Sequence, residues 1–127
     1  MLGINELGRG TPDSFCNQFR AVVNEIQSLQ PQAVIYIESI MHVTQAKDDE
    51  GSYIHNGEID ARNEKIQTIA DAVNIFWLDV NEVFDASGTG KLNPEYTSDG
   101  VHLKPMYIGV WQDFLLKHVI IRQSAGN

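Results

Sequence analysis

Apolar side chains recur every three or four residues in three stretches of the chain, a spacing that gathers them on one face of a helix. The first stretch follows Thr11 and Pro12, which are typical residues for the start of a helix, and it ends before Pro31. The second covers residues 58–73 and the third covers residues 105–121. The pattern therefore predicts three helices.

Two continuous apolar runs lie between the predicted helices, at residues 33–37 and 75–80. They are rich in β-branched and aromatic side chains, which is typical of strands buried on both faces of a parallel sheet. Residues 1–4 resemble the end of a further apolar strand, although strands usually contain about five or six residues. The alternation of strands and helices predicts parallel strands joined by right-handed crossovers in a layered α/β domain.

The composition is that of an ordinary globular domain. The chain has 127 residues, of which 43% are hydrophobic and 20% are charged. Its 17 acidic and 9 basic residues give a net charge of −8, which disfavours nucleic acid and anionic membranes as partners. No apolar run is long enough to insert into a membrane. The single cysteine, Cys16, lies beside the apolar face of the first predicted helix, where we expect it to pack.

A long polar stretch, residues 38–57, lies between the apolar run at residues 33–37 and the second predicted helix. Loops of this length often form lids or binding loops. Its acidic cluster, residues 48–50, lacks the spacing of an EF-hand, so we expect a solvated charge run. His42 and His55 have no second ligand at metal spacing, and we expect both to be surface or substrate-loop residues. The sequence indicates no metal or cofactor.

Asp99 and His102 lie three residues apart, just before the last predicted helix. At this spacing the carboxylate can accept a hydrogen bond from one ring nitrogen while the other nitrogen moves a proton, as in a hydrolytic triad. Sites in such folds lie beyond the carboxyl ends of the strands. Asn5 follows the first apolar run, so its amide is the expected oxyanion donor there. The alternative is that Asn5 only closes the strand as a turn residue.

These two segments resemble two sequence blocks of one enzyme family. Residues 1–7, MLGINEL, resemble the G-x-N-D block of the SGNH hydrolases, the family of GDSL-like lipases, esterases and acylhydrolases. Residues 98–103, SDGVHL, resemble the family's D-x-x-H block. The resemblance covers the chain except its tail. It implies a flavodoxin-like, three-layer α/β/α fold with a parallel sheet.

The resemblance also implies a role for each matching residue. His102 corresponds to the general base, Asp99 to its orienting carboxylate and Asn5 to an oxyanion donor. Gly3 corresponds to the small residue that lets the backbone pass close to the site. Glu6 stands where the family usually has Asp, one methylene shorter, and we expect this difference to have little effect on the chemistry.

The family's nucleophile block, Gly-Asp-Ser, does not occur in this sequence, and neither does a G-x-S-x-G elbow. Ser39 and Ser98 lack the strand-to-helix setting that activates a hydroxyl, so we expect no nucleophile in this chain. Residues 1–122 then correspond to the C-terminal part of one SGNH domain without its first strands, and residues 123–127 to a disordered tail. The sheet surface left exposed predicts a homo-oligomer or a domain swap.

Two functions remain open from the sequence. In the first, the parent protein is a serine esterase or acylhydrolase that cleaves small acyl esters, such as acetylated carbohydrates or lysolipids, with the serine outside this chain. The chain alone is then inactive. In the second, the chain is a nucleophile-less domain that acts as a non-catalytic binding or scaffolding module. Both cytoplasmic and secreted locations remain open.

Overall fold

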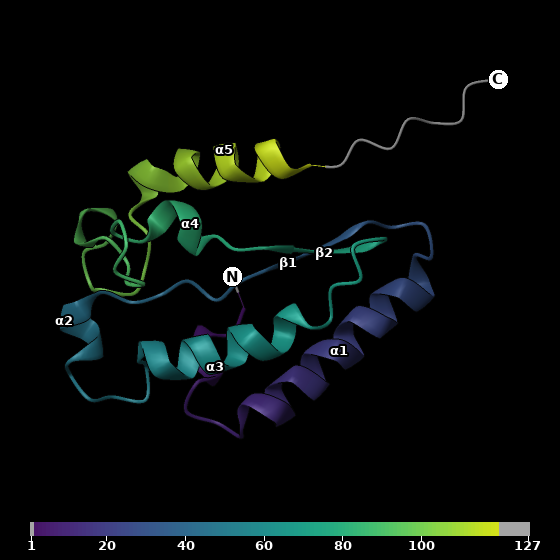
Figure 1. The fold of residues 1–127 in the computed structure, drawn as a ribbon, viewed down its shortest axis with the longest axis horizontal. Helices are drawn as coiled ribbons and strands as arrows, with labels where there is room; N and C mark the ends of the chain where they lie inside the picture. The colour runs from purple at the N-terminus through teal and green to yellow at the C-terminus, as the bar shows by residue number, and fades with distance from the viewer. Residues whose placement is uncertain (1, 120–127) are drawn as a thin grey trace.

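Two parallel strands, β1 (Ile35–Glu38) and β2 (Ile75–Leu78), form the centre of the computed structural model, which describes residues 2–119 (Figure 1). Ile35 pairs with Ile75, and Glu38 pairs with Leu78 at the carboxyl end. The prediction of a layered α/β fold with parallel strands is therefore confirmed. Both strands are shorter than the apolar runs that predicted them.

Helices cover both faces of this sheet, giving three layers (Figure 1). The long helices α1 (Pro12–Leu29) and α3 (Asn56–Gln67) lie side by side on one face. On the other face lie the short helix α4 (Asn81–Phe84) and the last helix, α5 (Ile108–His118). The three-layer α/β/α arrangement is the predicted one. No helix within residues 2–119 is both long enough and apolar enough to cross a membrane.

The start of α1 confirms its sequence signal. The Thr11 hydroxyl accepts a hydrogen bond from the backbone N–H of Ser14, and the Ser14 hydroxyl accepts one from the N–H of Thr11. This reciprocal pair satisfies two donors that a helix start leaves free. Cys16, in the next turn, is buried, and its thiol donates to the Lys65 carbonyl of α3. The packing role expected for this cysteine is confirmed.

The strand predicted at residues 1–4 is wrong for the residues that the structure describes. Ile4–Glu6 forms a short 3₁₀ helix, η1. Gly3 precedes it with a φ of 114°, outside the range of a strand, and its carbonyl accepts from the Glu6 N–H. A side chain at Gly3 would place its Cβ 2.7 Å from the Ile40 side chain, so only glycine fits here.

The second predicted helix is shorter than its apolar pattern. It spans Asn56–Gln67 instead of residues 58–73. Asp71 ends the helical run because its Oδ1 accepts three backbone N–H groups, those of residues 73, 74 and 75, and folds the chain into the turn before β2. The neighbouring Ala72 has a φ of 57°, which a helix does not allow.

The last helix begins with a short 3₁₀ turn, η3 (Pro105–Tyr107), which continues into α5. Its predicted extension to residue 121 and the predicted disordered tail at residues 123–127 fall outside the described residues. The polar stretch 38–57 contains one short helix, α2 (Gln45–Asp48). Residues 39–44 of that stretch are buried, so the first half of the predicted loop belongs to the core.

An apolar groove follows β1 between α1 and α5, with a cavity volume of about 550 Å³. Val22 and Ile26 of α1 line it from one side and Leu115 of α5 from the other, while Ile37 lines it from β1. Val22 is 55% exposed and Ile26 is 40% exposed. The structure therefore has an open apolar surface beside the sheet.

Candidate active site

Asp99 and His102 form a hydrogen-bonded pair in the loop before η3. Nδ1 of His102 lies 2.6 Å from Oδ2 of Asp99. Because the carboxylate accepts the proton on Nδ1, the basic nitrogen of the neutral ring is Nε2. Nε2 has no hydrogen bond within residues 2–119, and the His102 side chain is 77% exposed. The ring is therefore oriented and free to take a proton.

The second oxygen of Asp99 organises the loop itself. Oδ1 accepts the backbone N–H groups of His102 and Val101, at 2.7 and 2.9 Å, and the hydroxyl of Thr97 at 3.2 Å. The pKa of Asp99 lies well below its usual value. The largest cause is the bond from the His102 backbone N–H, followed by the bond from the His102 ring. Asp99 is thus ionised at neutral pH and can stabilise an imidazolium.

Gly100 lets this loop pack against the start of α2. Its φ is 82°, and an added Cβ would lie 2.8 Å from the Thr44 hydroxyl and 2.9 Å from the Lys47 Cβ. The Thr44 N–H donates to the Gly100 carbonyl at 3.0 Å. A bridge between Thr97 and Leu103 closes the base of the loop. Gly100 is therefore required here, because a larger side chain would collide with Thr44 and Lys47.

Asn5 and His102 line the same cavity, which has a volume of about 340 Å³. Asn5 reaches it from η1, so the structure brings together the two segments that the sequence placed at one sheet edge. Besides Asn5 and His102, the lining side chains are apolar. They are Ile4, Met41, Val101, Leu103, Ile108 and Trp111. The cavity therefore offers one proton acceptor, one amide and an apolar wall.

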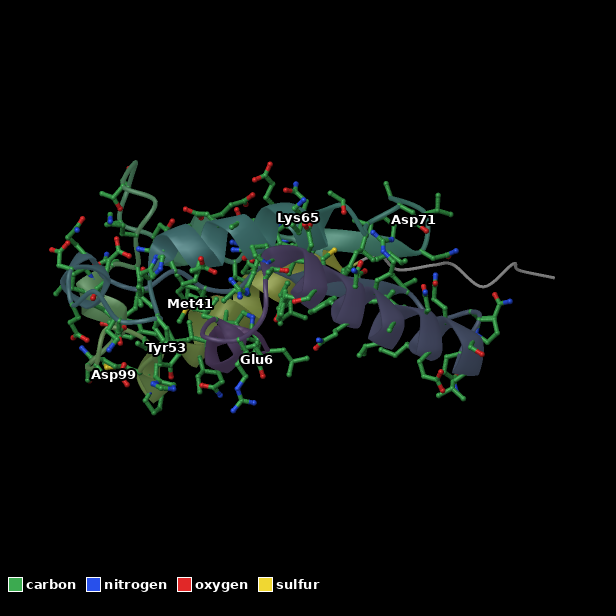
Figure 2. The ribbon with its side chains drawn as sticks, turned by 90° about the horizontal axis from the view of Figure 1, so that it is seen from below. Glu6, Met41, Tyr53, Lys65, Asp71 and Asp99 are labelled. Carbon is green, nitrogen blue, oxygen red and sulfur yellow. The ribbon has the colours of Figure 1, made fainter. Side chains whose placement is uncertain are left out.

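Trp111 connects this cavity to the sheet. Its indole N–H donates to Oε1 of Glu38, the last residue of β1, at 3.0 Å. The cavity thus lies beyond the carboxyl end of β1, where sites in parallel α/β folds are found. In Figure 2, Asp99 and Met41 lie toward one end of the molecule, and Asp71, which precedes β2, lies toward the other.

Comparisons with known proteins identify the family of this chain. The model of the GDSL-like Lipase/Acylhydrolase family matches residues 1–106. The chain belongs to this family. A search of curated proteins found no match.

A solved structure, described as a candidate platelet activating factor from Streptococcus pneumonia, shares the fold with a TM-score of 0.80 and 24% sequence identity. The match covers 93% of this chain and 56% of that chain. This family member therefore spans little more than half the length of the solved chain. The SGNH-type fold that the sequence predicted is confirmed.

The two serines considered as nucleophiles make no hydrogen bond with His102 within residues 2–119. Ser39 is 1% exposed, and its hydroxyl donates to Oδ1 of Asp79 and accepts from the N–H of Val80, both at 2.9 Å. It therefore ties the end of β1 to the end of β2. Ser98 is exposed, and neither hydroxyl makes a hydrogen bond with His102 among the contacts of the described chain.

Three buried asparagines that sequence reasoning missed hold the segment of residues 39–44. Asn63 accepts the Ile40 N–H at 2.7 Å and donates to its carbonyl at 2.9 Å, and Asn56 does the same for Val43. The side chain of Asn81 accepts the backbone N–H of His42. These side chains replace the strand that would otherwise pair with this extended backbone. A detectable signal was the place of Asn56 and Asn63 on the isoleucine face of α3.

Arg62, also missed, anchors the segment that carries Asn5. Its side chain is fully buried, and its Nη2 donates to the carbonyls of Leu7 and Arg9 at 3.3 and 3.2 Å. Glu58, one turn earlier in α3, pairs with the guanidinium. A buried arginine needs such partners, because an unpaired buried charge is strongly destabilising. α3 therefore fixes the position of η1.

One expectation for the polar stretch is wrong, and a second, the solvated acidic cluster, holds for Asp49 and Glu50 but not for Asp48. His42 is not a surface residue, because it is buried between the carboxylates of Asp60 and Asp85. The acidic cluster is not fully solvated, because Asp48 pairs with Lys91 at 2.8 Å and accepts the Asn56 N–H at 2.6 Å. These contacts lower the pKa of Asp48. Within the described residues no group of acidic, histidine or cysteine side chains could hold a metal ion.

Proposed function

We propose that this chain supplies the acid–base half of a serine acylhydrolase site that cleaves small acyl esters. The observation that carries the proposal is the hydrogen-bonded pair of Asp99 and His102, together with the cavity that His102 and Asn5 both line. Membership of the GDSL-like Lipase/Acylhydrolase family supports it. The nucleophilic serine lies outside this sequence, so the chain alone is inactive.

In this mechanism the serine hydroxyl attacks the ester carbonyl while Nε2 of His102 takes its proton. Asp99 keeps Nδ1 protonated and stabilises the imidazolium that forms. The Asn5 amide donates to the oxyanion of the tetrahedral intermediate. As the intermediate collapses, His102 returns the proton to the leaving alcohol, and an acyl-enzyme remains. His102 then takes a proton from water, which attacks the acyl-enzyme, and it returns that proton to the serine oxygen as the acid is released.

The cavity wall favours an uncharged acyl group. Met41, Leu103 and Trp111 are among the apolar side chains that line it, and His102 is its one titratable lining residue. Acetylated carbohydrates and lysolipids both place such a group at the reacting carbon. They differ in the alcohol, so the alcohol side of the ester is the part that assays must identify.

The test is hydrolysis of a short p-nitrophenyl ester by the full-length parent enzyme. We expect His102→Ala to lower kcat/KM by about 10³-fold or more and Asn5→Ala to lower it by about 10²–10³-fold. His118→Ala is the matched control, because His118 is an exposed residue of α5 whose ring bonds to its own helix. Unchanged turnover in His102→Ala would overturn the assignment.

The second candidate function is a non-catalytic binding or scaffolding module. It is favoured by the absence of a Gly-Asp-Ser block from the sequence and by the lack of a hydrogen bond between His102 and either Ser39 or Ser98 among the described residues. Reading the coding sequence upstream of Met1 separates the two candidates. An in-frame Gly-Asp-Ser supports the hydrolase, and a start codon without an upstream extension supports the module.

A further inference from the structure

His42 joins three separate parts of the fold through one buried ring. Its Nδ1 lies 2.7 Å from Oδ2 of Asp85, the residue that ends α4, and its Nε2 lies 2.8 Å from Oδ1 of Asp60 in α3. His42 itself belongs to the buried segment of residues 39–44. One side chain therefore connects the helices on opposite faces of the sheet.

The geometry requires the charged form of this ring. A neutral imidazole has one N–H donor, whereas a carboxylate oxygen lies within hydrogen-bond distance of each nitrogen of His42. If either nitrogen lost its proton, its lone pair would face a carboxylate. Asp60 is 65% exposed and can turn into water, but Asp85 is only 16% exposed, and its Oδ1 is buried with no hydrogen-bond partner among residues 2–119. Loss of the imidazolium therefore leaves a buried carboxylate poorly compensated.

The segment of residues 39–44 contributes to the cavity that His102 lines and also contacts the loop that carries Asp99 and His102. The neighbouring Met41 lines the cavity that contains His102. The backbone N–H of His42 donates to Oδ1 of Asn81 at 2.8 Å, and this bond holds the backbone of His42 in place. Two residues later, the Thr44 N–H donates to the carbonyl of Gly100, in the loop of Asp99 and His102. A change at His42 can therefore reach the loop through three consecutive residues.

We propose that His42 is a positioning residue, a protonated clamp between Asp60 and Asp85 that holds residues 39–44 against the Asp99–His102 loop and loosens when it loses its proton. Its link to ester hydrolysis rests on the proposed function. The clamp itself does not, and it is measurable in this chain without any substrate.

The direction of the pH dependence follows from the groups that face the ring. These are the carboxylates of Asp60 in α3 and of Asp85, the residue directly after α4, with no lysine or arginine in ion-pair distance among residues 2–119. Burial, the largest single effect, lowers the pKa of His42, but the hydrogen bonds and charges of Asp85 and Asp60 together outweigh it and raise the pKa above 6.5. The clamp is therefore complete below that value and is lost as the pH rises through the higher pKa of the folded chain.

The test is an NMR titration of this chain between about pH 5 and pH 9, with hydrogen exchange of the Thr44 amide as the second measurement. We expect the His42 ring to titrate above pH 6.5, the ordinary value of a histidine side chain. After correction for intrinsic exchange, Thr44 protection should fall about tenfold or more across the His42 titration. In His42→Gln protection should be low at every pH, whereas His55→Gln, the matched control, should keep the behaviour of the parent chain.

Asp60→Asn keeps the test decisive if His42→Gln does not fold. The substitution is at an exposed carboxylate and keeps an oxygen acceptor, so we expect a folded chain whose His42 ring titrates at a lower pH. A His42 midpoint at or below about pH 6.5, or Thr44 protection that is independent of pH, would overturn the proposal. Because neither measurement uses an ester, failure of the hydrolase assay would leave this result unaffected.

Discussion

The Thr44 backbone N–H donates to the Gly100 carbonyl at 3.0 Å, and this bond joins the segment after β1 to the loop of Asp99 and His102. Thr44 and Gly100 are 56 positions apart in the sequence, and their hydrogen bond holds the two segments against each other. Asp99 organises the loop from within, and residues 39–44 have asparagine side chains in place of a neighbouring strand. The site is therefore built from contacts that no single segment contains.

Replacing Gly100 should test how closely these two segments pack. Gly88→Ala is the matched control, because Gly88 also has a positive φ, of 71°, but has no atom within 4 Å of an added Cβ. We expect Gly88→Ala to cost about 1–2 kcal/mol of unfolding free energy. Gly100→Ala should cost about 1–3 kcal/mol more, since its Cβ collides with Thr44 and Lys47. Urea denaturation measures both, and equal costs would contradict the close contact.

Removing one of the three buried asparagine side chains that hold residues 39–44 should destabilise the fold. Asn63→Ala leaves the N–H of Ile40 buried without its partner, while the Ile40 carbonyl keeps the amide of Asn81 as a donor, so we expect a cost of about 1–3 kcal/mol. Asn24→Ala, at an exposed position of α1, should change the unfolding free energy by less than about 0.5 kcal/mol. Chemical denaturation of both variants gives the comparison. A loss in Asn63→Ala as small as that in Asn24→Ala would show that water replaces the side chain.

The contacts of Asp99 should make the fold sensitive to acid. Its pKa in the folded chain lies below the ordinary value of 3.8, so its stabilising effect is present above that value and is lost as the pH falls toward the folded pKa. We therefore expect Asp99→Asn to be less stable than the parent chain at about pH 6, with a smaller difference at about pH 3. Thermal unfolding at both pH values measures this. A difference that grows in acid would contradict the assigned bonds.

The bond between Trp111 and Glu38 should hold the cavity wall against the sheet. Glu38→Ala removes the acceptor of the indole N–H, whereas Glu38→Gln keeps an oxygen in its place. We expect hydrogen exchange at the Trp111 indole to accelerate about tenfold in the alanine variant and to change little in the glutamine variant. The Trp77 indole serves as the internal reference. Equal exchange in both variants would show that packing, not this bond, holds Trp111.

Self-association of this chain stays a prediction, and the groove beside β1 is the surface to test. Val22 and Ile26 are exposed apolar residues of α1 that line it. If a second copy covers the groove, light scattering should show an apparent mass that rises with concentration, and Ile26→Lys should lower it. Gln18→Lys, at an exposed position of the same helix, is the control for added charge. A monomer at high concentration with cooperative unfolding would contradict the prediction.

The sequence predicted well the features that depend on local physics. The Thr11 cap with Pro12 marked the start of α1, and two β-rich apolar runs marked the parallel strands. These signals lie within a few residues and follow from backbone propensities and apolar periodicity. The spacing of Asp99 and His102 also indicated their hydrogen bond, because a three-residue turn brings the carboxylate to the ring.

The sequence by itself determined the layered α/β fold, the family and the two segments that meet at the candidate site. Only the tertiary structure decided what surrounds them. His42 appears in the sequence as one more polar loop residue, and Gly3 as the end of a strand. Their actual places depend on Asp60, Asp85 and Ile40, which lie far from them in sequence and come into contact only when the helices pack on the sheet. Burial of a polar group depends on such distant partners, and a local pattern does not contain them.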